Sequence, residues 1–182
     1  MLLDVNDPET EELVAKYVAL LQLPTSNLRI TTNHGTFESW LGRRVSGSIG
    51  GAYAYSPGKR EHLVLINLAR IDRSRPRSVE IVVAEELIHM QDRLEGDLRR
   101  HAKHGYDRIA HRVAGITGAS LEEVRGCLLP KETRPLRYLY ACPKCNLTVR
   151  RRRRGVWSCG RCSRRFDPRL VLRLIRDDLS DE

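Results

Sequence analysis

The stretch EIVVAEELIHM, residues 80–90, places Glu85, Glu86 and His89 in the middle of a run of apolar side chains. On a helix, the apolar residues would fall on nearly every side, which is typical of a buried helix. A buried carboxylate is unfavourable unless it is paired or bound to a metal. Glu85 and His89 are four residues apart and share one helix face, with Glu86 beside them. The pattern therefore predicts that this helix holds a cation.

The spacing is that of the H-E-x-x-H metalloprotease helix with glutamate in place of the first histidine. Catalytic zinc takes three protein ligands and keeps a position open for water, so a third ligand is required. The segment HAKHGYD offers His101 and His104. The alternative is that the E-E-x-x-H string is only a solvated helix face. The other histidines are expected to be surface or structural residues: His34, His62 and His111.

The residues around this helix predict an α+β fold in which helices pack on a small antiparallel sheet. Apolar residues at helical spacing, and an S-x-x-E capping box, indicate three more helices. Alternating or β-branched segments divided by Gly and Pro indicate the strands. We expect helices over residues 10–22, 79–94 (with Ser78 as a cap) and 106–115, a short one from 120–123, and strands over 28–32, 45–55 and 62–67.

The cysteines predict a second, smaller module. Four of the five are paired as CPKC and CGRC, thirteen residues apart, which indicates a metal site and not a disulfide framework. Four thiolates close a tetrahedral structural zinc site of the ribbon type, so the expected ligands are Cys142, Cys145, Cys159 and Cys162. Cys127 is expected to be a small core residue.

Most of the chain's excess of basic over acidic residues lies in this module. Residues 136–176 hold 13 Lys and Arg against a single acid, Asp167. Arginines beside an exposed aromatic can contact phosphates and stack on bases, whereas the alternative is a solvated charge run. We expect nucleic-acid binding without strong sequence preference through Arg150, Arg151, Arg152, Arg153, Arg154, Trp157, Arg164 and Arg165.

The chain has 182 residues, which is enough for one ordinary domain and a small second module. No signal-like start and no apolar run of membrane-spanning length is present, so we expect an intracellular protein, cytoplasmic or associated with the nucleoid, that does not bind membranes. Charge and Pro130 and Pro135 indicate a domain boundary. We expect a first domain over 1–135, a zinc ribbon over 136–168 and a C-terminal tail over 169–182, in which RLVLRLIRDDL packs on the ribbon or, as the alternative, binds a partner.

The order of these features resembles the SprT/Spartan family of zinc metalloproteases. The resemblance rests on RPRSVEIVVAEELIHM, a His-Gly fifteen residues after His89, and YLYACPKC followed by WSCGRC, and it covers roughly residues 28–166. It implies that His89 and His104 are zinc ligands and that Glu86 is the general base. Glu85 takes the place of the family's first histidine.

The resemblance also implies a function. The expected activity is a DNA-associated zinc metalloendopeptidase that cleaves proteins bound or crosslinked to DNA, in DNA–protein crosslink repair, with the substrate extended along an edge strand such as HLVLIN. A glutamate ligand adds negative charge, so the second metal could be Mn or Fe instead of Zn. The alternative is a catalytically weak or inactive nucleic-acid-binding zinc protein, because Glu85 replaces histidine.

Overall fold

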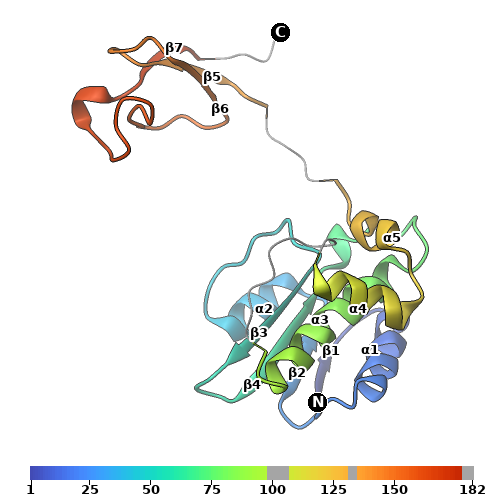
Figure 1. The fold of residues 1–182 in the computed structure, drawn as a ribbon. Coiled ribbons are helices and arrows are strands. Elements are labelled where there is room, and N and C mark those ends of the chain that lie inside the picture. Colours follow the sequence, from blue (N-terminus) through green and yellow to red (C-terminus); the bar gives the residue numbers. More distant parts are fainter. Residues whose placement is uncertain (98–106, 131–134, 178–182) are drawn as a thin grey trace. The chain divides into compact units, whose positions relative to one another are not determined.

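The computed structural model describes residues 1–97, 107–130 and 135–177, and the chain divides into two compact units, Met1–Pro130 and Lys131–Glu182. Each unit has its own hydrophobic core. Figure 1 shows that helices surround one sheet in the first unit, whereas the second unit is built mainly from strands.

The sheet of the first unit is mixed, so the predicted antiparallel sheet is wrong. Its order is β1 (Leu2–Asp4), β2 (Leu28–Thr31), β4 (Glu61–Ile66) and β3 (Gly51–Ser56). β1, β2 and β4 run parallel, and β3 alone pairs antiparallel with β4. β1 and β2 are parallel because α1 connects them and lets the chain return to the sheet in the same direction. After β2 and α2 the chain enters β3 in the opposite direction, and the turn from β3 into β4 makes β4 parallel to β2.

Helices cover both faces of this sheet. On one side pack α1 (Pro8–Leu20) and α3 (Ser78–Leu94), and on the other packs α2 (His34–Leu41), which the sequence did not predict (Figure 1). Side chains of β4 alternate between the two layers, as they must in a strand. Val64 and Ile66 join the core with α1 and α3, whereas Leu63 and Leu65 pack with Phe37 of α2.

Helix α3 is buried on most of its surface, as its sequence predicted. Its apolar residues Ile81 to Ala84, Leu87, Ile88 and Met90 are all buried. Its start differs from the prediction, because Ser78 is the first helical residue and Arg77, in the left-handed region with φ 60°, is the N-cap without a side-chain capping bond. The helix is tied to α1 by Glu80, which accepts hydrogen bonds from Lys16 at 2.6 Å and from Tyr17 at 2.7 Å.

Two helices complete the first unit. α4 (Arg108–Thr117) is capped by Asp107, and α5 (Leu121–Gly126) begins with the predicted capping box of Ser120 and Glu123. A single 3-10 turn, Leu68–Arg70, follows β4. Cys127 is fully buried in the core, in agreement with the sequence prediction. None of the helices in the described ranges is long and apolar enough to cross a membrane.

The second unit is a three-stranded antiparallel sheet in the order β6 (Thr148–Arg151), β5 (Tyr138–Ala141) and β7 (Arg173–Arg176). A 3-10 turn, Pro168–Leu170, precedes β7. The small core contains Tyr140, Leu172 and two of the paired cysteines, Cys142 and Cys159. Arg173–Arg176, within the segment expected to pack on the ribbon, is thus a strand of this unit's own sheet.

Candidate functional site

Helix α3 places Glu85, Glu86 and His89 in two environments. Glu85 and His89 are half-buried, whereas the side chain of Glu86 is buried, with only 6% of its surface exposed. Residues four apart share a helix face, so Glu85 and His89 stand one above the other, and Glu86 is rotated by about 100° from Glu85. The pair can offer a carboxylate and an imidazole to one ion, while Glu86 faces a different neighbour.

That neighbour is the edge strand β3. A Cβ atom added to Gly51 would lie 2.5 Å from Oε1 and 2.7 Å from Cγ of Glu86, so the carboxylate side chain fills the space that any larger residue would need. The sheet order makes β3 an edge strand and puts β4 between β2 and β3. The expectation that HLVLIN, which is β4, forms the edge is therefore wrong, and the edge beside Glu86 is β3.

Further along β3, aromatic and basic side chains meet the second half of α3. The rings of Tyr55 and His62 are 5.0 Å apart, and the Arg93 guanidinium lies 4.7 Å from the Tyr55 ring centroid. Tyr53 and His62 share a hydrogen bond of 2.8 Å. Burial raises the pKa of Tyr53 to about 12, and burial, helped by the charge of Arg93, lowers the pKa of His62. His62 is thus a neutral, bonded residue, as expected of a structural histidine.

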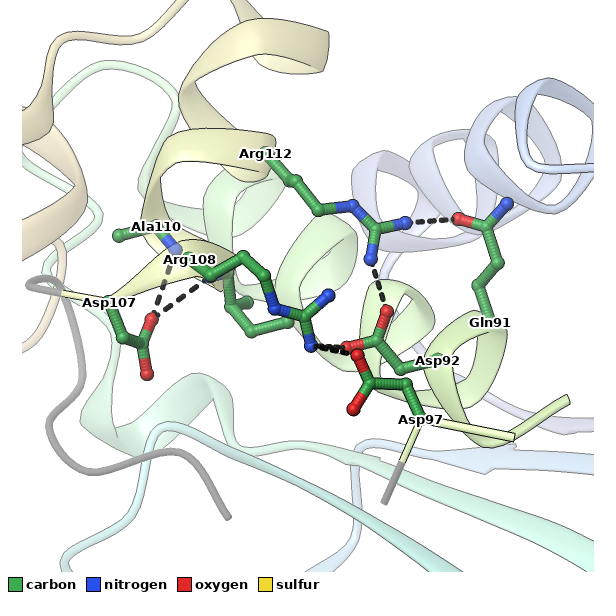
Figure 2. Close-up of polar contacts among 8 residues, drawn as sticks. Gln91, Asp92, Asp97, Asp107, Arg108, Ala110 and Arg112 are labelled. Atoms are coloured by element: carbon green, nitrogen blue, oxygen red, sulfur yellow. Dashed lines mark hydrogen bonds and ion pairs between the residues drawn. The ribbon is translucent and has the colours of Figure 1, made fainter. Parts of the chain in front are cut away.

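The predicted third ligand, His104, and its substitute His101 lie outside the described residues. The residues on either side of them are firmly held, as Figure 2 shows. Arg108 of α4 bridges Asp92 of α3 at 2.7 Å and Asp97 at 2.9 Å. At the start of α4, Asp107 accepts hydrogen bonds from the backbone N–H groups of Ile109 and Ala110.

Asp92 is the centre of this network. It is 2% exposed and also pairs with Arg112, which in turn donates to Gln91 at 2.6 Å (Figure 2). A buried carboxylate is unfavourable unless it is paired, and Asp92 has two guanidinium partners, Arg108 and Arg112. The network therefore joins the end of α3, which carries His89, to the start of α4.

The four paired cysteines come together in the second unit. Their potential ligand atoms all lie within 4.8 Å of one another, with Sγ–Sγ distances of 3.8 Å for Cys142–Cys162 and 3.7 Å for Cys145–Cys159. Zinc–sulfur bonds of about 2.3 Å at tetrahedral angles require sulfurs about 3.8 Å apart. The cysteine geometry therefore fits a zinc ion, and this part of the predicted metal binding is supported by the structure.

The backbone around the first knuckle favours thiolate. The Lys144 N–H donates to the Cys142 Sγ at 3.4 Å. Hydrogen bonding from the backbone of Cys145, together with that from Lys144, lowers the pKa of Cys142 to about 6. Thiolate is the form that binds zinc. Among the described residues, these four cysteines form the one cluster of three or more potential metal ligands, and a set completed by His101 or His104 falls outside that description.

The predicted nucleic-acid residues divide into two groups. Arg150, Arg152, Arg153, Arg154, Arg164 and Arg165 are exposed. Trp157 is half-buried instead, contrary to the expected exposed aromatic. Its ring meets the ring of Tyr140 edge-on at 5.2 Å, and the Arg151 guanidinium lies 5.5 Å from its centroid. A Cβ atom added to Gly155 would lie 2.7 Å from the Trp157 ring, so the backbone at Gly155 also packs against this ring.

An exposed aromatic does exist nearby, but at another position. Phe166 is 63% exposed and directly follows Arg164 and Arg165. The sequence signal that identifies it is an apolar ring between charged residues just after the last ligand cysteine. The residue of the first unit that sequence reasoning missed is Gly51, whose contact with Glu86 joins segments far apart in the chain.

Comparison with known proteins gives no family assignment. No family model, curated protein or solved structure matches the chain significantly.

Proposed function

We propose that this protein is a DNA-associated metallopeptidase of the SprT/Spartan type that cleaves proteins bound or crosslinked to DNA. The observation that carries the proposal is the position of Glu86, which is buried against the edge strand β3 beside the Glu85–His89 pair. A base, a pair of potential metal ligands and a strand edge that can bind an extended peptide then belong to one region of the first unit.

The metal of this region would be held by Glu85, His89 and a histidine of the segment between Asp97 and Asp107, His104 or its substitute His101. A set of two histidines and one glutamate binds catalytic zinc in other proteases, so the donor chemistry fits zinc, with Mn or Fe as the alternatives. A zinc ion bound there would acidify a water molecule and polarise the scissile carbonyl.

The chain's own residues supply the remaining steps. Glu86 takes the proton of the attacking water and delivers it to the amide nitrogen as the peptide bond breaks. Burial of this carboxylate against Gly51 fixes its direction, because the side chain has little space in which to move. The outer edge of β3, which pairs with no other strand among the described residues, binds the substrate as an additional strand, with backbone hydrogen bonds that do not depend on substrate sequence.

The ribbon brings this activity to DNA. Its arginines can form paired hydrogen bonds to phosphates, and the few acids in the module neutralise little of their charge. Phosphate contacts of this kind carry no base specificity. The second candidate function is an inactive nucleic-acid-binding zinc protein, and the observation that favours it is Glu85 itself, because an anionic ligand weakens a metal as a Lewis acid.

DNA should accelerate cleavage of a DNA-bound basic protein by at least about tenfold, because the ribbon and the substrate on one DNA molecule raise the effective concentration of each for the other. The measurement is the rate of substrate loss for the zinc-loaded full chain with and without DNA. The control variant replaces Arg150–Arg154 with alanine and should lose the acceleration but keep the DNA-independent rate. Absence of cleavage with zinc and DNA would favour the inactive candidate, and equal rates with and without DNA would disprove the role of the ribbon.

Gly51→Ala should lower peptide cleavage by about tenfold or more. The new Cβ would overlap the Glu86 carboxylate and move the base, and overpacking of this kind also costs about 1–3 kcal/mol of stability. Cleavage rates and thermal unfolding are measured together. Gly47→Ala is the matched control, because an added Cβ there meets nothing within 4 Å. A Gly51→Ala enzyme as active as the parent would show that the position of Glu86 is not important.

A further inference from the structure

Strand β3 and helix α3 run side by side in the same direction, and the proposed chemistry lies at only one end of them. Gly51, the first residue of β3, lies against Glu86. At the other end of the strand, the Arg93 guanidinium lies 4.7 Å from the ring centroid of Tyr55. Four residues of strand span about 13 Å. A peptide paired along β3 therefore reaches, about four residues from the cleaved bond, a part of the surface that the proposed mechanism does not use.

This end of β3 carries three cations. Arg93 is half-buried and held on the Tyr55 ring, whereas Lys59 and Arg60 are exposed in the turn that joins β3 to β4. None of the three forms an ion pair with an acid in the described part of the chain. Glu95, two residues after Arg93, lies about 200° around α3 from it. The positive charge at this end of the strand is therefore not paired within the described residues.

The other acids nearest in sequence have partners of their own. Glu61, the first residue of β4, lies 3.0 Å from Arg29. Asp97, just after α3, lies 2.9 Å from Arg108 (Figure 2). Residues 98–106, which lie outside the described ranges, include no acid in their sequence. The excess of positive charge beside the end of β3 thus does not depend on where those residues lie.

An extended peptide that pairs with β3 would pass these cations in order. Side chains of paired strands lie beside one another on each face of a sheet, so a substrate side chain next to Tyr55 on the α3 face comes within reach of Arg93. The substrate residues beyond it pass the end of the strand, where Lys59 and Arg60 lie. Carboxylates are the side chains that guanidinium and ammonium groups bind in proteins. The charge of this surface therefore matches a peptide with acidic side chains at these positions.

We infer that the end of β3 selects protein substrates that carry acidic side chains about four or more residues from the cleaved bond, through Arg93, Lys59 and Arg60. The inference rests on the peptidase activity proposed above and specifies its substrate. DNA phosphates repel the acidic segments of a bound protein, so these segments face away from the DNA. They are therefore the segments that stay accessible to a peptidase on a protein bound to DNA.

The test begins with the bonds that the zinc-loaded full chain cuts in a mixture of unstructured peptides, identified by mass spectrometry of the products. We expect Asp and Glu to be enriched on one side of the cut bond, beginning about four residues from it. One such peptide and a copy with Gln in place of these acids are then compared by kcat/KM. The acidic peptide should be cleaved about tenfold faster at low salt, as a few ion pairs allow, and added salt should reduce the difference.

Variants test the three cations themselves. Lys59→Gln, Arg60→Asn and Arg93→Gln together should remove the preference; Asn is chosen because Arg60 has a left-handed backbone with φ 54°. Lys59→Glu with Arg93→Glu should instead favour a copy of the peptide with Lys at the acidic positions, which a purely structural role would not produce. Parent-like cleavage of the Gln peptide shows that each variant is folded. Arg164→Gln with Arg165→Gln, the matched control, removes two exposed cations from the second unit and should keep the preference.

The outcomes separate this inference from the proposed function. Cleavage without enrichment of acids near the cut bonds, or a preference that survives in the triple variant, would overturn the acidic selection and leave the peptidase proposal intact. Absence of cleavage of every peptide with zinc, Mn or Fe would overturn both. A triple variant that keeps the peptide preference but binds DNA more weakly than the parent would assign the three cations to nucleic acid and overturn their role in substrate selection.

Discussion

Glu86→Gln is expected to lower peptide cleavage by on the order of a hundredfold or more while the protein keeps its metal and its fold. Glutamine has nearly the same shape as glutamate and fits the space beside Gly51, but it cannot take the proton of the attacking water. The loss should appear in kcat, because the base acts in the transition state and not in substrate binding. The measurement is steady-state cleavage with metal content determined on the same samples.

The matched control for this variant is Glu95→Gln, which changes an exposed carboxylate at the end of the same helix. It should cleave at the parent rate. Parent-like activity of Glu86→Gln would disprove the proton-transfer role and with it the proposed mechanism. If the parent itself does not cleave with any of the candidate metals, the inactive nucleic-acid-binding protein becomes the better description.

Cys159→Ser combined with Cys162→Ser is expected to remove one zinc per chain and to unfold the ribbon. The buried core of this unit is very small, so metal binding, with an apparent free energy on the order of 10–16 kcal/mol in small zinc modules, supplies most of its stability. Native mass spectrometry gives the metal content. Near-ultraviolet circular dichroism should lose the signal of Trp157, which packs on Tyr140 in the folded ribbon.

Cys127→Ser is the control for the double variant, because Cys127 is buried in the first unit and lies outside the cysteine cluster. It should retain the ribbon zinc, although loss of packing can lower the stability of the first unit. An unchanged zinc content in the double variant would show that the four sulfurs, despite their spacing, are not the ligands.

Local features of the fold could be predicted from the sequence, and long-range ones could not. The continuous apolar run of α3 and the capping box at Ser120 are decided by residues within a few positions of one another. The direction of the strands depends on α2, whose sequence HGTFESWL has no clear periodicity, and on β1, which is only three residues long. Without those two elements, three separated strands suggested an antiparallel sheet.

The candidate site also combines local features, which the sequence predicts, with long-range contacts, which it does not. The spacing of Glu85 and His89 and the two C-x2-C knuckles are local, and the knuckles meet in space as predicted. The contact of Gly51 with Glu86 and the ion pairs of Asp92 with Arg108 and Arg112 join distant segments, so no local pattern indicates them. Trp157 was misjudged because charged neighbours in the sequence do not reveal that Tyr140 lies against its ring.

We propose that Glu85 lies in an apolar helix because it binds a metal together with His89. Native mass spectrometry of the intact protein tests it most directly, by counting metal ions per chain in the parent and in Glu85→Ala. We expect two ions in the parent, one in Glu85→Ala with the ribbon zinc retained, and two again in Glu85→His, because histidine is the usual zinc ligand at this spacing. A parent that holds only the ribbon zinc, or a Glu85→Ala protein that still holds both ions as tightly as the parent, would contradict it.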